Sequence, residues 1–523
     1  MFHGQLITYK ISKMKNIKYV LLSAVLIGFT ACNDEEDFEQ YLDNPTQEEV
    51  LPALTAGTAD FSNYVSIGNS LTAGYTDNAL FIAGQTNSMP NMLSQKFALA
   101  GGGTFTQPLM NDNIGGLLFG GVQNADGSFG PRLYFDGSGP ATLPGTSTTE
   151  ALAPSIGSHN NMGVPGAASF HLLFNGYGNP ANLATTPATA NPYFVRIASS
   201  PSATILGDAL AQQPTFVSLW IGNNDILGYA TAGADATLGA ITPQPMFDAS
   251  IDAIIGSLQS AQVQGVMANI PYVTTIPHFT TVPHNPVPLD AATAAFLNSA
   301  SVYGAYNAGI QGAFAYLVSV NAISQEDADA EIAKRTITFE AGESNAVVIM
   351  DENLTDLTSI DANLVSMRQA TAEDLLVLSA STFIGTEAIP GNSATVNGVA
   401  IPLADKWVLT PEEQNEIKIA TDTFNAKLLD AANTAGFAFV DANALMQQLD
   451  STGYPDGDFV LTSSLVTGGV FSLDGVHPTA RGYALLANQF MKAIDATYGS
   501  NFEASGNLVD SGDYPTNYPP TLQ

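Results

Sequence analysis

The chain has 523 residues, of which 45% are hydrophobic and only 12% are charged. This is enough apolar sequence for a large core, organised as about one to three domains. The 48 acidic residues outnumber the 15 basic ones, and the formal net charge of −33 repels the phosphate backbone of nucleic acids. We therefore expect no nucleic-acid partner.

Residues 1–31 have the pattern of a secretory signal peptide. Lysines up to Lys18 precede the apolar run YVLLSAVLIGFTA, which stops at Cys32 and is too short to span a bilayer stably. A start at Met14 would give a shorter signal peptide than a start at Met1. Cys32 is the single cysteine, so no internal disulfide can form.

The sequence around Cys32 resembles a bacterial lipobox. In FTAC the cysteine would be lipidated and become the mature N-terminus, and NDEED after it is similar to signals that send some Gram-negative lipoproteins to the outer surface. The resemblance implies an exported lipoprotein of the outer membrane or cell surface, joined to the membrane by the lipid on Cys32. The alternative is a plain cleaved signal peptide and a periplasmic or secreted protein. Residues 32–58, acidic and then rich in Pro and Thr, are expected to form a tether.

From residue 59 onward, apolar runs alternate with helical patterns, which predicts an α/β domain over 59–499 and a C-terminal tail over 500–523. One helix is predicted at about 246–263, and another begins at Thr410, where Thr410 and Glu413 form a capping box. Continuous apolar strands between helices predict a parallel sheet covered on both faces. The predicted strands are 63–67, 215–221, 265–270, 346–350 and 437–441.

Two long segments exceed what such a sheet needs. Residues 75–155 are rich in Gly, Thr, Pro and Asn, and residues 300–400 hold a helix candidate and the acidic stretch SQEDADAEIAKR. Segments this long usually form functional covers or small subdomains, so both are interpreted as insertions. The acidic run 325–331 is expected to be a solvated helix face, since nothing in it resembles a calcium-binding loop.

Small polar residues follow several of the predicted strands. Gly-Asn-Ser, ending at Ser70, follows the first strand, and Gly-Asn-Asn-Asp, which contains Asn224, follows the second. In open parallel sheets, ligands bind beyond the carboxyl ends of the strands, so a site is predicted at that edge. Ser70 could be a helix N-cap or a nucleophile displayed there.

The stretch FSLDGVHP near the end of the chain supplies what a serine nucleophile needs. Asp474 and His477 are three residues apart, so the carboxylate can hold one ring nitrogen and leave the other facing outward as a base. Backbone and amide donors must also face the developing oxyanion. Ser70 N–H, Gly166 in NNMGVPGAAS and Asn224 are the candidates, with Gly163 competing with Gly166 and a local structural role open for Asn224.

At these residues the chain resembles the SGNH, or GDSL-like, hydrolase family. The four family blocks match GNSLTAG, NMGVPGA, GNND and DGVHP in order, and the resemblance covers roughly 60–290 and 405–495. It implies a flavodoxin-like three-layer α/β/α sandwich. It also implies a Ser-His-Asp triad of Ser70, His477 and Asp474, an oxyanion hole of Ser70, Gly166 and Asn224, and no metal or cofactor. Asn69 departs from the family's usual aspartate before the serine.

The expected function is therefore an exported serine esterase or lipase that hydrolyses carboxylic esters of small molecules, lipids or glycans. The alternatives are a carbohydrate O-deacetylase with the same mechanism and a surface lipoprotein that binds glycans or lipids without turnover. The remaining histidines have no second ligand at metal spacing and are expected to be ordinary polar residues: His159, His171, His278 and His284. The acyl-chain length and the oligomeric state stay open.

Overall fold

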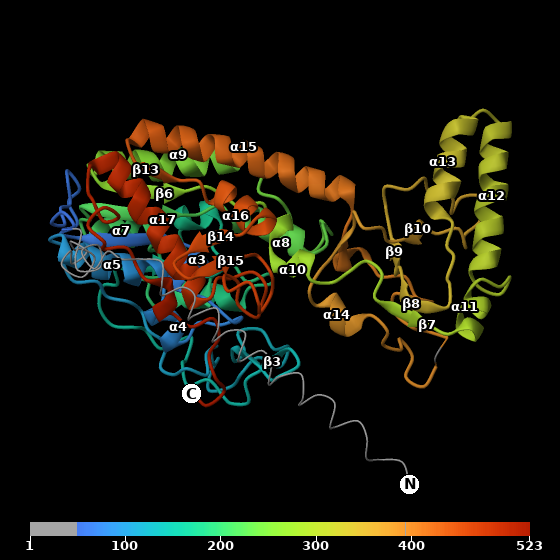
Figure 1. The fold of residues 1–523 in the computed structure, drawn as a ribbon, viewed down its shortest axis with the longest axis horizontal. Helices are drawn as coiled ribbons and strands as arrows, with labels where there is room; N and C mark the ends of the chain where they lie inside the picture. Colours follow the sequence, from blue (N-terminus) through green and yellow to red (C-terminus); the bar gives the residue numbers. More distant parts are fainter. Residues whose placement is uncertain (1–49, 393) are drawn as a thin grey trace, which may run out of the picture. The chain divides into compact units, whose positions relative to one another are not determined.

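A five-stranded parallel sheet forms the centre of the structure, a computed structural model that describes residues 50–392 and 394–523 (Figure 1). All residues of the inner strands β1 and β5 are buried, which explains their largely apolar sequences. Every pairing within this sheet is parallel. The strands are β1 (Tyr64–Gly68), β4 (Asn161–Gly163), β5 (Phe216–Trp220), β6 (Gln264–Ala268) and β13 (Ala438–Val440).

The strand order across the sheet is β13-β6-β5-β1-β4. Numbered along the chain, the five strands therefore lie in the order 2-1-3-4-5, which is the flavodoxin-like arrangement. The order in which the chain adds strands to the sheet reverses between β1 and β5, since β4 is added on one side of β1 and β5 on the other. Ligands bind at such a switch point, beyond the carboxyl ends of the strands. Ser70 and Asn224 follow these two neighbouring strands.

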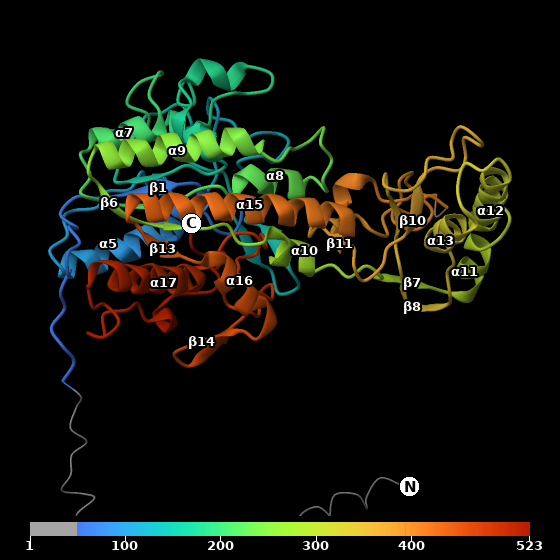
Figure 2. The ribbon, with the colours of Figure 1, turned by 90° about the horizontal axis from the view of Figure 1, so that it is seen from above.

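Helices cover both faces of the sheet, and this confirms the predicted three-layer α/β/α fold. Figure 2 shows α7 (Ile205–Ala211) and α9 (Gln244–Ser260) on one side of the strands and α5 (Met89–Leu99) and α17 (Ala480–Tyr498) on the other. Helix α15 (Pro411–Ala435) packs along α9, where the rings of Phe247 and Phe424 stack with centroids 3.9 Å apart. Its predicted capping box between Thr410 and Glu413 is present.

The other elements lie in the connections between the strands. Segment 69–160, between β1 and β4, holds α3 (Ser70–Ala73), α4 (Ile82–Thr86), α5, β2 (Leu133–Phe135) and β3 (Pro140–Thr142). Segment 164–215, between β4 and β5, holds η1 (Ser169–Leu173), η2 (Pro180–Ala184), α6 (Pro192–Val195) and α7. Segment 221–263, between β5 and β6, holds α8 (Asn224–Thr231) and α9. After β13 come α16 (Ala442–Ser451), β14 (Tyr454–Asp456), β15 (Phe459–Leu461), α17 and η5 (Ser511–Asp513).

The connection between β6 and β13 is the longest, and most of it forms small two-stranded sheets and helices of its own (yellow to orange in Figure 1). It begins with η3 (Val273–Thr275) and α10 (Pro277–Thr280), and we call the part that follows the 282–409 segment. Its helices are α11 (Ala291–Leu297), α12 (Tyr303–Ser319), α13 (Gln325–Arg335), α14 (Ala380–Phe383) and η4 (Asp405–Trp407). Its strands are β7 (Val287–Leu289), β8 (Gly342–Asn345), β9 (Val348–Met350), β10 (Met367–Gln369), β11 (Leu375–Leu376) and β12 (Val408–Leu409).

Two strand predictions need correction. The apolar run 346–350 is not part of the central sheet, because β9 pairs antiparallel with β10, and its residues Val348 and Ile349 are buried. The edge strand β4, which pairs with β1 through Ser66 and Asn161, lies where only a glycine turn was expected. Its three residues, Asn-Met-Gly, are too few to carry a strand pattern.

Residues 54–523 form one unit, separate from residues 1–53. The described residues begin at residue 50. They do not include the predicted signal peptide, the predicted lipidation site Cys32 or most of the predicted tether. In the described part of the chain, no helix combines the length and the apolar character that a membrane span requires.

Candidate active site

Ser70 stands at the end of β1 because the chain turns there directly into α3. A Cβ on Gly68 would lie 2.4 Å from the carbonyl oxygen of Trp220, so only glycine allows this close approach between the strands. Asn69 is the N-cap, with its side-chain oxygen accepting a hydrogen bond from the N–H of Leu71 at 3.0 Å. The capping role considered for Ser70 therefore belongs to Asn69. Ser70 is the first residue of the helix.

The side chains of Ser70, His477 and Asp474 form a continuous hydrogen-bonded chain. The Oγ of Ser70 lies 2.9 Å from Nε2 of His477, and Nδ1 of His477 lies 2.9 Å from Oδ2 of Asp474. The loop before α17 carries both later residues and approaches β1 across 407 positions of sequence. This geometry lets the imidazole accept the serine proton while the carboxylate fixes its tautomer.

Asp474 is held in its charged form by the groups around it. Burial would raise the pKa of this carboxyl, but His477 and the N–H groups of His477 and Val476 lower the pKa well below its usual range. Both N–H groups donate to Oδ1 at 2.8 Å. An additional N–H, that of Asn78, donates to Oδ2 at 2.9 Å. A carboxylate with this many donors stays ionised and keeps a fixed orientation.

The turn 76–79 is a part of the site that the sequence did not predict. Asp77 and Asn78 both have positive φ, 50° and 64°, which points the N–H of Asn78 at Asp474. The carboxylate of Asp77 accepts from the N–H of Leu473 at 3.1 Å, and its own N–H donates to Ser472 Oγ at 3.0 Å. The Thr-Asp-Asn sequence could have indicated a turn, since Asp and Asn tolerate this conformation, but not its partner.

Three donors from three strand ends gather at the same edge of the sheet. Gly166, at φ 83°, and Ser70 have backbone N–H groups that donate to no other group among the described residues. The N–H of Gly163, by contrast, donates to Asn161 Oδ1 at 3.0 Å. Asn224 is the first residue of α8, and its amide donates one hydrogen to the carbonyl oxygen of Ala167 at 2.9 Å. The second hydrogen of that amide has no acceptor among the described residues.

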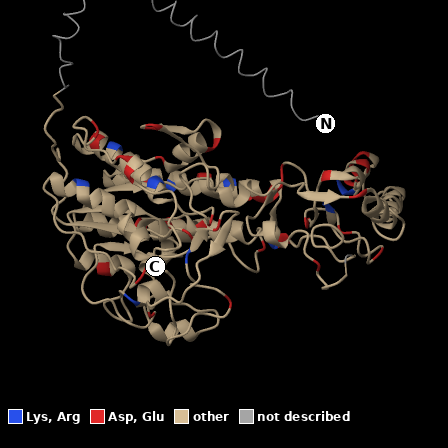
Figure 3. Ribbon diagram, turned by 60° about the horizontal axis from the view of Figure 1, so that its bottom comes forward, with Lys and Arg blue, Asp and Glu red and all other residues tan. Residues whose placement is uncertain are grey.

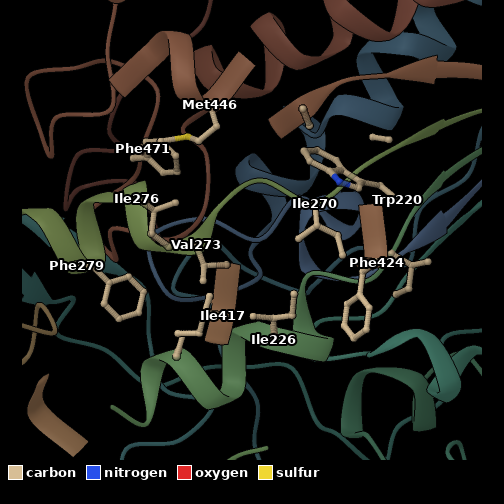
Figure 4. Packing of buried hydrophobic residues seen from close by; sticks show 14 of the residues in the cluster. Trp220, Ile226, Ile270, Val273, Ile276, Phe279, Ile417, Phe424, Met446 and Phe471 are labelled. Atoms are coloured by element: carbon tan, nitrogen blue, oxygen red, sulfur yellow. The ribbon is translucent and has the colours of Figure 1, made fainter. Parts of the chain in front are cut away.

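An apolar pocket opens beside Ser70 and His477. Its wall combines the strand end at Trp220, the short helix η3 and helices α8, α16 and α17. Figure 4 shows Met446 and Phe471 next to each other, with Val273 and Ile276 nearby. Helix α16 was not predicted, although Asp441 as N-cap and apolar residues at Ala442, Leu445, Met446 and Leu449 have helical spacing. The apolar lining residues include Trp220, Leu227, Val273, Ile276, Leu445, Met446, Leu449, Phe471, Leu485 and Leu486.

Two other histidines, His171 and His278, lie near these elements and are partly buried. Burial lowers the pKa of His171 to about 4, and its Nδ1 accepts a hydrogen bond from the N–H of Ala168 at 3.0 Å. Burial also lowers the pKa of His278, whose backbone N–H donates to the carbonyl oxygen of Gly475 at 2.9 Å and so supports the loop of Asp474. Neither histidine reaches the serine through a hydrogen bond among the described residues.

Comparisons with known proteins give little beyond this geometry. No family model matches the chain, and no curated protein matches it. A structural match exists to the crystal structure of an extracellular lipase from Streptomyces rimosus, at 12% identity and a TM-score of 0.30, over 83% of this chain and 99% of the lipase chain. A similarity this distant does not establish a shared fold or activity.

Proposed function

We propose that this protein is a serine hydrolase that cleaves carboxylic esters. The observation that carries the proposal is the alignment of Ser70 Oγ, His477 and Asp474 through two 2.9 Å contacts at the switch point of the sheet. A serine hydroxyl is a weak nucleophile unless a base takes its proton, and an imidazole oriented by a buried carboxylate is such a base. The free N–H donors beside the serine add the stabilisation that acyl transfer needs.

The reaction follows from these positions. Ser70 Oγ attacks the ester carbonyl while Nε2 of His477 takes the proton, and the N–H groups of Ser70 and Gly166 with the amide of Asn224 receive the negative oxygen. The alcohol leaves with the proton from His477. Water, deprotonated by the same histidine, then attacks the acyl-enzyme and frees Ser70. Asp474 stabilises the imidazolium in both halves.

The lining of the pocket favours esters with an apolar acyl chain. Met446, Leu449 and Phe471 offer no hydrogen-bonding side chain, and burial of each methylene there gains about 0.8 kcal/mol. A glycan would leave its hydroxyl groups unpaired on such a wall, which is costly. We therefore favour an acyl-ester substrate over an acetylated carbohydrate.

Turnover of p-nitrophenyl esters tests the proposal. We expect hydrolysis by the wild-type protein and a loss of at least about 10³-fold in Ser70→Ala, because the nucleophile is gone. Ser464→Ala, an exposed serine outside the site, is the matched control and should keep full activity. A wild-type protein that binds acyl esters or glycans without cleaving them would contradict the proposal and favour a binding lipoprotein.

We also propose that the protein is exported and anchored to a membrane through a lipid on Cys32, on the strength of the lipobox-like FTAC sequence. Metabolic labelling with a radioactive fatty acid should mark the wild-type protein. Cys32→Ala should abolish the label and move the protein from the membrane fraction to the soluble fraction. An unlabelled wild-type protein would favour the plain signal peptide instead.

A further inference from the structure

Three carboxylates converge at a place far from the catalytic serine in sequence. Glu352 follows strand β9, Asp405 begins η4, and Glu413 lies in the first turn of α15. One oxygen from each lies within 4.8 Å of the other two. An ion placed centrally between three such atoms would lie no farther from each of them than 4.8 Å divided by √3, which is about 2.8 Å. Calcium binds oxygen ligands at about 2.3–2.6 Å, so a small adjustment suffices.

Two of these side chains each hold a buried oxygen that has no hydrogen-bond partner among the described residues. Glu413 is 3% exposed, and its Oε1 receives no hydrogen bond from any described residue. Its other oxygen is fixed by the N–H and hydroxyl of Thr410, at 2.6 Å and 2.9 Å, so Oε1 cannot turn away without breaking the helix cap. Oδ1 of Asp405 is also buried and unpartnered among the described residues. Buried acceptors without donors are costly, which indicates a missing ligand.

Basic side chains do not compensate the charge of these three carboxylates through ion pairs among the described residues. Among the described residues, no lysine or arginine forms an ion pair with Glu352, Asp405 or Glu413. Lys334 pairs instead with their neighbours, Asp351 at 3.6 Å and Glu412 at 3.5 Å. The charge of the three carboxylates is therefore not balanced by an ion pair among the described residues.

The pKa values of the cluster reflect this lack of compensation. Burial, followed by the nearby Glu352, raises the pKa of Glu413 to about 8 despite the hydrogen bonds from Thr410. Burial, followed by Glu352 and Asp235, raises the pKa of Asp405 to about 7.

We propose that Glu352, Asp405 and Glu413 bind a calcium ion that joins the 282–409 segment to helix α15. Three carboxylates suit a hard cation that prefers charged oxygen ligands and accepts variable geometry. Magnesium fits less well, because it demands near-octahedral geometry at about 2.0–2.1 Å and retains several waters. The ion is structural and takes no part in the chemistry at Ser70, so this proposal does not depend on the proposed function.

Calcium binding to the whole exported chain, at a pH above both raised pKa values, tests the proposal directly. Calorimetric titration after EDTA treatment should give one saturable site per chain, with calcium bound more tightly than magnesium. Calcium should also raise the midpoint of thermal unfolding relative to EDTA, since a ligand that binds only the folded state stabilises it. Glu413→Gln and Glu352→Gln should each weaken calcium binding by at least about 10-fold, because each removes one charged ligand.

Asp430→Asn is the matched control, because it removes an equal charge from an exposed position of the same helix. It should leave calcium affinity unchanged. Glu352 is exposed, so its variant should fold even where Glu413→Gln does not. Absence of saturable calcium binding to the wild type, equal affinity for magnesium, or unchanged affinity in Glu352→Gln would overturn the proposal and assign the charge balance to protons.

Discussion

Asp474 is the most extensively bonded carboxylate of the candidate active site. It accepts from three backbone N–H groups and from the ring of His477. These donors matter because the proposed chemistry needs one tautomer of the imidazole, with the proton on Nδ1 and a free lone pair on Nε2. The orientation of His477 is thus set by the backbone of two separate loops.

Replacing Asp474 by asparagine tests that role. Asp474→Asn keeps the shape but offers an NH₂ group to Nδ1, which favours the wrong tautomer, so we expect kcat to fall by about 10⁴-fold. Ester turnover measures the loss, and circular dichroism checks that the fold is intact. Asp458→Asn, at an exposed position, should change neither. A kcat within 10-fold of the wild type would remove Asp474 from the proposed mechanism.

Asp77 lies beside this network in a different electrostatic state. Burial raises its pKa to about 7, and the nearby Asp474 adds to the increase, while the N–H of Leu473 and Arg132 oppose it. Between pH 4 and 7 the folded state therefore holds a proton that the unfolded state has lost. Stability must fall as the pH rises through this range.

The variant Asp77→Asn removes this titration and keeps an oxygen for the N–H of Leu473. The free energy of unfolding of the variant minus that of the wild type, both measured with urea, should increase as the pH rises from about 4 to 8. The gain should reach about 4 kcal/mol, since the pKa shift is about three units and each unit corresponds to about 1.4 kcal/mol. A difference between the two proteins that is independent of pH would contradict the assignment.

At the scale of elements, helix α16 shapes the apolar pocket. Its residues Leu445, Met446 and Leu449 face the pocket, while Ala444 is exposed on the opposite side. Under the proposed function, this helix contributes to the limit on acyl-chain length, and no hydrogen bond among the described residues joins it to the residues that align the serine.

Filling the pocket should change specificity without abolishing activity. In Met446→Trp we expect kcat/KM for a long-chain p-nitrophenyl ester to fall by at least about 10-fold, while the value for the acetate stays within a few fold, because the bulky ring occupies the space of the chain. Ala444→Trp adds the same ring on the outer face and should leave both values unchanged. An equal loss for both esters in Met446→Trp would argue against an acyl-chain pocket.

The central elements of the fold were predictable because their signals are local. Four of the five sheet strands are apolar runs flanked by turn residues, and the capping box at Thr410 marked the start of α15. Strand β4 carried no such signal, since it is a strand through its pairing with β1. The run 346–350 gave a false signal for a strand of the central sheet, because burial inside a small segment produces the same apolar pattern as burial in that sheet.

The residues of the candidate site were likewise predictable only where their signal is local in the sequence. The short blocks around Ser70, Gly166, Asn224 and Asp474–His477 were identifiable because each has a distinctive sequence. The N–H of Asn78 and the cluster of Glu352, Asp405 and Glu413 were not, because they depend on contacts between positions far apart in the chain. Glu413 was assigned a capping role from its sequence, and its second oxygen acquires a further role only in the folded protein.

At the scale of the whole molecule, excess negative charge is the dominant feature. Acidic positions are spread over the ribbon in Figure 3, with few basic positions among them, in keeping with the net charge of −33. Their mutual repulsion opposes the compact state. Much of this repulsion acts between exposed groups and is therefore open to screening by salt.

Monovalent salt should consequently stabilise the protein. In EDTA, the midpoint of thermal unfolding should rise by several degrees between about 0.01 M and 0.15 M KCl, as the Debye length falls from about 30 Å to about 8 Å. Differential scanning calorimetry measures the midpoint, and an equal osmolality of glycerol separates screening from a general solute effect. A midpoint that falls with KCl would indicate that attractive ion pairs outweigh the repulsion.

The central claim is that His477 activates the hydroxyl of Ser70, and covalent labelling tests it most directly. A fluorophosphonate probe should modify the wild-type protein at Ser70 alone, as located by mass spectrometry of its peptides, since only an activated serine reacts. The label should vanish in Ser70→Ala and fall by at least about 10³-fold in rate in His477→Ala. A folded wild-type protein that stays unlabelled, or carries the label on another serine, would contradict the claim.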